Sequence, residues 1–132
     1  MNSKLRLLLV VVASALTASN PPRATAASEE AEKEVILALI TRMEATWNRG
    51  DFRGYMEGFA NPDMVFVSRG RLRFFDIRIE MLAPDTAQLI SRYQLDRPQN
   101  SQDGINTRLM RKRGDKWVIA LNSIHAGAQR SC

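Results

Sequence analysis

The sequence predicts an α+β domain in which two N-terminal helices pack on one face of an antiparallel sheet. Two observations predict it: apolar residues recur every three or four positions between residues 28 and 60, and they alternate with polar residues between 71 and 125. Helices followed by consecutive strands belong to this class rather than to the alternating α/β folds. With 132 residues, the chain is long enough for one domain.

Residues 1–26 are expected to be a signal peptide. Two basic residues precede an apolar run at positions 7–16, which has the length of a signal h-region and is too short to span a bilayer. Small-x-small cleavage patterns end at positions 15 and 26, and we favour cleavage near Ala26. The alternative interpretation of the apolar run is a buried helix. We therefore expect residues 27–132 to form a single domain that a bacterium exports to its periplasm or secretes, without a stable membrane anchor.

Composition argues against several classes of partner and cofactor. Removing residues 1–26 takes away three of the 19 basic residues and none of the 14 acidic ones, so the net charge falls from +5 to +2. This weak charge argues against a nucleic-acid partner. The single cysteine and single histidine exclude an intrachain disulfide and a Cys-rich or multi-His metal site. The sequence also contains no phosphate-binding loop, so we expect no cofactor.

The first helix is expected between Ser28 and Asn48. Ser28 suits the N-cap and Gly50 suits the stop. A second helix, from Phe52 to Ala60, should be capped by Asp51. One stripe of the first helix is apolar and should face the core; it comprises Val35, Ile36, Leu39, Ile40, Met43 and Trp47.

The rest of the chain predicts strands. A short apolar run at 64–67 comes first, and a long strand at 71–82 changes its alternation near Phe74 and Phe75, which indicates a β-bulge. The last strand, 117–125, is apolar on both faces and is therefore expected to be central in the sheet. Between these strands lie two further ones at 87–95 and 105–109, a polar loop at 97–103 and a hairpin tip at 111–116.

Two motifs resemble a known family. The sequence Trp-Asn-Arg-Gly-Asp-Phe at 47–52 is followed by a turn containing Asp63 and by the run at 64–67, and Gly-Asp-Lys-Trp-Val-Ile at 114–119 opens the last strand. Both are similar to the NTF2-like superfamily, most closely to its DUF4440 or SnoaL-like subgroup, which is related to ketosteroid isomerase. The resemblance covers residues 31–126. It implies a cone in which the two helices pack on a curved antiparallel sheet around a pocket.

The chain departs from this family in one respect. A third helix usually separates the first strand from the long strand, whereas here only two or three residues around Arg69 and Gly70 stand between them. The missing helix implies a shallower pocket, and apolar sheet that is exposed or covered by a partner chain. We therefore expect a homodimer formed through the sheet face, with domain swapping as one form of it.

His125 and Asp63 are the candidate catalytic residues. His125 is the only histidine and can transfer protons near neutral pH. It is in phase with Trp117 and Ile119, and the resemblance implies that this end of the strand points into the pocket. Asp63 lies in the turn before the first strand, at the expected pocket mouth. A solvated strand-end histidine and a turn-forming aspartate are the alternatives.

Tyr55, Trp47, Tyr93 and Asn122 are the candidate ligand-binding residues, because they place polar groups on otherwise apolar elements. Core packing is the alternative for the aromatic residues, and a hydrogen bond at the sheet edge is the alternative for Asn122. Together the candidates predict a domain that binds a hydrophobic small molecule, with isomerase- or cyclase-like proton transfer as an added activity. The alternative is a non-catalytic dimerisation module with a degenerate pocket, since this fold serves both purposes.

Overall fold

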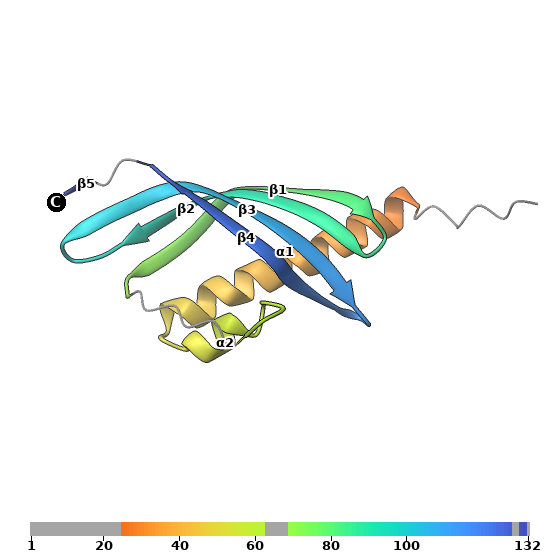
Figure 1. Ribbon diagram of the computed structural model, residues 1–132, viewed down its shortest axis with the longest axis horizontal. Coiled ribbons are helices and arrows are strands. Elements are labelled where there is room, and N and C mark those ends of the chain that lie inside the picture. The colour runs from red at the N-terminus through yellow and green to blue at the C-terminus, as the bar shows by residue number, and fades with distance from the viewer. Residues whose placement is uncertain (1–24, 63–68, 128–129, 132) are drawn as a thin grey trace, which may run out of the picture.

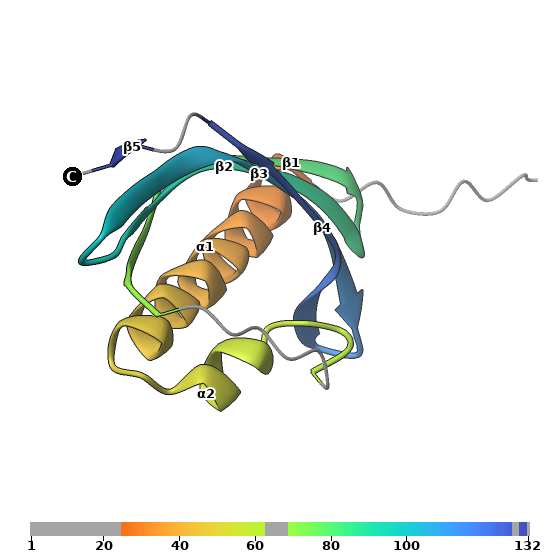
Figure 2. The ribbon, with the colours of Figure 1, turned by 60° about the vertical axis from the view of Figure 1, so that its left-hand side comes forward.

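The computed structural model describes residues 25–62, 69–127 and 130–131. A long helix lies against the concave face of a curved antiparallel sheet (Figure 1), and Figure 2 shows the sheet arched over that helix, with the short second helix at its C-terminal end. The α+β class is therefore as predicted. The elements are α1 Ala26–Asn48, α2 Phe52–Met56, β1 Arg71–Ala83, β2 Thr86–Asp96, β3 Asn100–Arg113, β4 Lys116–Ala126 and β5 Arg130–Ser131.

The four long strands follow one another in the order β1-β2-β3-β4, and β5 pairs with the start of β3. In the described part of the sheet β4 is thus an outer strand, and the prediction that it is central was wrong. Its apolar character has another cause. The segment after α2 lies beside β4: the Ile119 amide donates to Gly58 O at 2.8 Å, and the Ala60 amide donates to Ile119 O at 2.9 Å.

The N-cap of helix α1 lies three residues earlier than the expected one, Ser28. Thr25 is the cap, and its side chain accepts a hydrogen bond from the Ser28 amide. The predicted apolar stripe is buried except for Val35, which is exposed. None of the helices in the described residues is long and apolar enough to cross a membrane. The predicted signal peptide up to residue 24, which includes the apolar run at 7–16, lies outside these residues, as do Asp63 and the predicted strand at 64–67.

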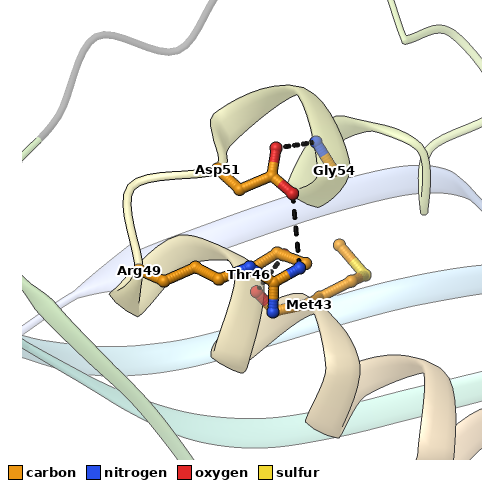
Figure 3. Close-up of polar contacts among 5 residues, drawn as sticks. All are labelled: Met43, Thr46, Arg49, Asp51 and Gly54. Atoms are coloured by element: carbon orange, nitrogen blue, oxygen red, sulfur yellow. Dashed lines mark hydrogen bonds and ion pairs between the residues drawn. The ribbon is translucent and has the colours of Figure 1, made fainter.

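The junction between the helices accounts for part of the 47–52 motif (Figure 3). Asp51 is the N-cap of α2, as predicted: its Oδ1 accepts from the Gly54 amide at 2.9 Å, and its Oδ2 lies 3.3 Å from Arg49 Nη2. Thr46 Oγ1 donates to Met43 O at 2.8 Å, which satisfies a buried hydroxyl. Gly50 has φ 78°, a left-handed conformation that ends α1. Helix α2 stops at Met56, not Ala60, because the following residues turn to pair with β4.

The C-terminal end of α1 is tied to β1 by side chains of the same motif. Asn48 donates to Leu72 O and accepts from the Leu72 amide, both at 2.8 Å. Glu44 Oε2 accepts from the Phe74 amide at 2.8 Å. Trp47 Nε1 donates to Gly70 O at 2.9 Å. These bonds satisfy backbone groups on the free side of β1, which would otherwise form an unprotected sheet edge.

Two β-bulges set which side chains face α1. In β1 the register shifts between Phe75 and Arg78, with Asp76 at φ 51°, so the predicted change of alternation is confirmed. In β4 Ile119 pairs with Met110 while Leu121 pairs with Leu109, so Ala120 is skipped. Side chains beyond Ala120 therefore change faces relative to those before it, which the alternation in the sequence did not reveal.

Candidate ligand-binding cavity

A cavity of about 240 Å³ lies between the C-terminal end of α1, helix α2 and the concave face of the sheet. Most of its wall is aromatic or aliphatic, and its polar groups come from the sheet, from Arg97 between β2 and β3 and from the hydroxyl of Tyr55 on α2. The described residues that line it are Trp47, Tyr55, Leu72, Phe74, Tyr93, Leu95, Arg97, Gln102, Asn106, Asn122 and Ile124.

The helical side of the cavity is an aromatic wall. Trp47 meets Tyr55 edge-on, with ring centroids 4.9 Å apart, and meets Phe52 in the same way at 5.1 Å. Such edge-to-face pairs stabilise one another beyond their buried area. Because the indole nitrogen of Trp47 is also bonded to Gly70 O, this ring has a fixed orientation.

The opposite wall comes from β2 and β3. Gln102 Nε2 donates to the Tyr93 hydroxyl at 3.2 Å. Gly104 is opposite Tyr93 in the register, and a Cβ at that position would lie 3.0 Å from Tyr93 Cε1 and against the backbone of β4. Only glycine leaves room for the tyrosine ring here.

The inner end of the cavity is polar. Asn106 and Asn122 line it, and Arg108 lies directly behind them, paired across the strands with Asn122. Arg108 is fully buried, and its guanidinium carbon is 4.3 Å from the centroid of the Phe74 ring. Among the described residues, none of its three side-chain nitrogens has a hydrogen-bond partner, and the side-chain oxygens of Asn106 and Asn122 have none either.

Burial controls the ionisation of the cavity hydroxyls. It raises the pKa of Tyr55, and the nearby charge of Arg108 opposes that rise only in part. Burial also raises the pKa of Tyr93. Both phenols are therefore neutral hydrogen-bond donors at neutral pH. Among the described lining residues there is no carboxylate and no imidazole, and no cluster of described acidic, histidine or cysteine residues could hold a metal ion.

Solved structures with the same architecture are numerous. An NTF-2-like protein of unknown function from Shewanella oneidensis is 27% identical, with a TM-score of 0.61, over 72% of this chain and 98% of its own. The putative scytalone dehydratase of Novosphingobium aromaticivorans is 10% identical, with a TM-score of 0.68, over 82% and 92%. A type 2 hexachlorocyclohexane dehydrochlorinase (LinA) is 9% identical, with a TM-score of 0.65, over 82% and 93%.

The chain has the NTF2-like fold. No protein-family model matches the sequence, and no curated protein is significantly similar to it. The superfamily expected from the motifs at 47–52 and 114–119 is thus the one that the solved structures indicate. The DUF4440 or SnoaL-like subgroup remains a prediction.

The NTF2-like fold brings all four predicted ligand-binding residues to one cavity: Trp47, Tyr55, Tyr93 and Asn122. It separates His125 from them. Because Ala120 is skipped, His125 is exposed on the opposite face of β4, where its Nε2 lies 3.4 Å from Ser123 Oγ. The predicted shared face with Trp117 and Ile119 was wrong, and His125 does not line this cavity. Asp63 lies outside the described residues.

Sequence reasoning did not single out Arg108 and Asn106. On β3 the residues Ile105, Thr107 and Leu109 alternate with these polar ones. Two of the three are apolar, so hydrophobicity alone assigns that set to the core. The NTF2-like fold does the reverse: Asn106 and Arg108 are buried, whereas Ile105 is 48% exposed. The one signal in the sequence for the buried face was that Asn106 and Arg108 are in phase with the apolar residue Met110, which is buried.

Proposed function

We propose that this protein binds a hydrophobic small molecule in the cavity between α1, α2 and the sheet. The observation that carries the proposal is a wall of packed aromatic rings, fixed by Trp47 and Tyr55, that encloses a cavity with a few polar groups at one end. Ligand sites have this composition in general. Two fold neighbours bear the names of enzymes with small organic substrates, which is consistent with the proposal.

A matched pair of variants on β4 tests the location of the site. Ile124 lines the cavity and is about half exposed, whereas Leu121 is exposed on the opposite face of the same strand. Ile124→Trp should fill the cavity entrance and weaken binding of the uncharged probe 2-naphthamide by about tenfold or more. Leu121→Trp should leave the affinity unchanged. Calorimetric titration measures both, and equal affinities would place the probe elsewhere.

Proton transfer of the isomerase or cyclase kind is a second proposed activity. The neutral hydroxyl of Tyr55, with the charge of Arg108 behind it, can donate to an oxygen on which negative charge develops. A base is also needed, and Asp63 is the candidate that the sequence offers. Asp63→Asn should abolish turnover and leave 2-naphthamide binding intact. Turnover that persists in Asp63→Asn would refute Asp63 as the base, and a wild type without turnover would confine the protein to binding.

We also propose that the protein forms a homodimer through the convex face of the sheet. Four large apolar side chains are exposed on that face: Leu82, Ile90, Ile105 and Leu121. Leu121→Asp should shift the protein from dimer to monomer in sedimentation velocity, because it places a charge within that surface. Ile124→Asp, on the concave face, is the control. A wild-type monomer at micromolar concentration would refute the dimer.

The signal peptide remains a proposal as well. Expression of the full chain should yield an exported protein that begins near residue 27, because the apolar run at 7–16 has signal-peptide proportions. Intact mass spectrometry of the protein from the periplasm or medium gives the cleavage site. An uncleaved, cytoplasmic product would contradict the proposal.

A further inference from the structure

The buried face of β3 is the polar one. Asn106 and Arg108 face α1 and are 3% and 0% exposed, while Ile105 faces solvent. Ser91, which is opposite Asn106 on β2, is also buried, and its hydroxyl has no partner among the described residues. These side chains and Asn122 form one polar cluster, which we name the polar floor: Ser91, Asn106, Arg108 and Asn122.

Arg108 is the charged member of the polar floor. The face of Phe74 lies 4.3 Å from its guanidinium carbon, and the Tyr55 hydroxyl acts on the guanidinium both electrostatically and as a long hydrogen-bond partner, although no guanidinium nitrogen has a described partner within 3.5 Å. A cation over an aromatic ring is attracted to it, but the ring replaces neither hydration nor a counter-charge. Buried charges in proteins are normally paired and hydrogen-bonded, because an unpaired one is strongly unfavourable.

Two members of the polar floor, Asn106 and Asn122, line the cavity, as do Tyr55 and Phe74. Arg108 lies behind these side chains: Asn122 is its partner in the register, Asn106 is two residues away on the same face of β3, and Phe74 and Tyr55 act on its guanidinium. The described lining residues include no carboxylate that could balance the charge of Arg108. The cavity therefore carries positive charge at an apolar site, where charges interact strongly.

We propose that the ligand of this cavity is an amphipathic carboxylate, whose anionic head binds at the polar floor to Arg108 and whose apolar body packs against the aromatic wall. This inference rests on the proposed function, since it names the chemical class of the molecule that the cavity takes.

The donors suit a carboxylate. A guanidinium presents paired N–H groups that match the two carboxylate oxygens. The amides of Asn106 and Asn122 can turn their N–H groups toward an anion, because their oxygens are not held by any described partner. The Tyr55 hydroxyl is a neutral donor. The cavity of about 240 Å³ is smaller than a site for drug-sized molecules, so the body of the ligand is compact.

The first test compares two probes of the same shape, 2-naphthoate and uncharged 2-naphthamide, by calorimetric titration of the full folded protein. Naphthoate should bind about tenfold or more tightly than the amide, because only the carboxylate neutralises Arg108. Acetate should bind far more weakly than naphthoate, because it lacks the apolar body. If acetate binds as tightly as naphthoate, the ligand is a simple anion and the proposal is wrong.

Three substitutions locate the carboxylate. Arg108→Met should abolish the preference for naphthoate over the amide while amide binding persists. Arg92→Met removes the same charge from the exposed outer face and should change neither affinity. Asn122→Asp places a carboxylate opposite Arg108, so it should weaken naphthoate binding far more than amide binding and stabilise the fold. This last variant keeps the test decisive if Arg108→Met does not fold.

The outcomes separate this inference from the proposed function. If naphthamide binds the wild type but naphthoate has no advantage, or if Asn122→Asp binds naphthoate as the wild type does, the carboxylate assignment fails and the cavity function stands. If neither probe binds the wild type or any variant, both proposals fail.

Discussion

Lys112 and Arg108 lie four residues apart on the same face of β3, and their surroundings differ completely. Lys112 Nζ is 2.5 Å from Glu32 Oε1 on α1, and the other oxygen of Glu32 accepts from Trp117 Nε1 at 2.6 Å. Both charged groups of this pair therefore have a partner within the chain. Arg108 is more deeply buried than Lys112 and has no hydrogen-bond partner among the described residues.

The contrast separates a structural charge from a charge that serves a ligand. The Glu32 carboxylate joins the first turns of α1 to the β3–β4 hairpin, so it fixes how the helix lies across the concave face of the sheet. Arg108 contributes no such link. A buried cation without a counter-charge is destabilising until an anion reaches it, and the cavity beside it provides the space for one.

The largest expected effect on the free energy of unfolding is beside the pair of Lys112 and Glu32. Trp117 is buried beneath α1, and Trp117→Ala should lower the free energy of unfolding by about 3–5 kcal/mol, because it leaves a large void and an unpaired Glu32 oxygen. Urea denaturation measures it. Trp117→Phe keeps most of the volume and should be milder; equal losses for both would show that the indole N–H, not packing, dominates.

Arg108→Met should act in the opposite direction to Lys112→Met. Without ligand, removing the unpaired buried charge should raise the free energy of unfolding by about 1–4 kcal/mol. Lys112→Met leaves Glu32 without its cation and should lower that free energy. Urea denaturation of both variants gives the comparison. If Arg108→Met destabilises the protein as much as Lys112→Met does, the distinction between the unpaired Arg108 and the paired Lys112 is wrong.

Glu32→Gln should lower the free energy of unfolding by about 1 kcal/mol at neutral pH, a modest loss because the pair is partly exposed. The hydrogen bonds from Lys112 and from Trp117 hold the pKa of Glu32 below its usual value of 4.5. The contribution is therefore present above pH 4.5 and is lost as the pH falls through the lowered pKa. The stability difference between wild type and Glu32→Gln should shrink in acid; a constant difference would contradict the pairing.

The smallest expected effect is on the pH at which Tyr55 ionises. Burial keeps the pKa of Tyr55 above its ordinary value of 10, and the charge of Arg108 limits the rise. Arg108→Met should therefore delay phenolate formation at Tyr55 to a higher pH, as measured by ultraviolet absorbance of the folded protein. Performing the titration in a Tyr93→Phe background leaves Tyr55 as the remaining tyrosine, since the chain has two. An unchanged titration would mean that Arg108 does not act on Tyr55.

Local chemistry in the sequence predicted much of this molecule. The apolar stripe of α1, the cap at Asp51 and the bulge in β1 depend on residues near one another in the chain, and periodicity reports them directly. The same reasoning selected Trp47, Tyr55, Tyr93 and Asn122, which the fold brings to one cavity. The motif at 47–52 was informative because its side chains cap α2 and bond to β1.

Tertiary structure alone decided the rest. The skipped residue Ala120 moved His125 to the outer face, and a bulge depends on pairing with a distant strand rather than on local alternation. The burial of Arg108 contradicts the pattern of its own strand, because hydrophobicity predicts which face is apolar and not which face encloses a cavity. The sequence by itself thus determined the fold class and the aromatic wall. Strand register decided which polar side chains the cavity received, because register is set by contacts between residues far apart in the chain.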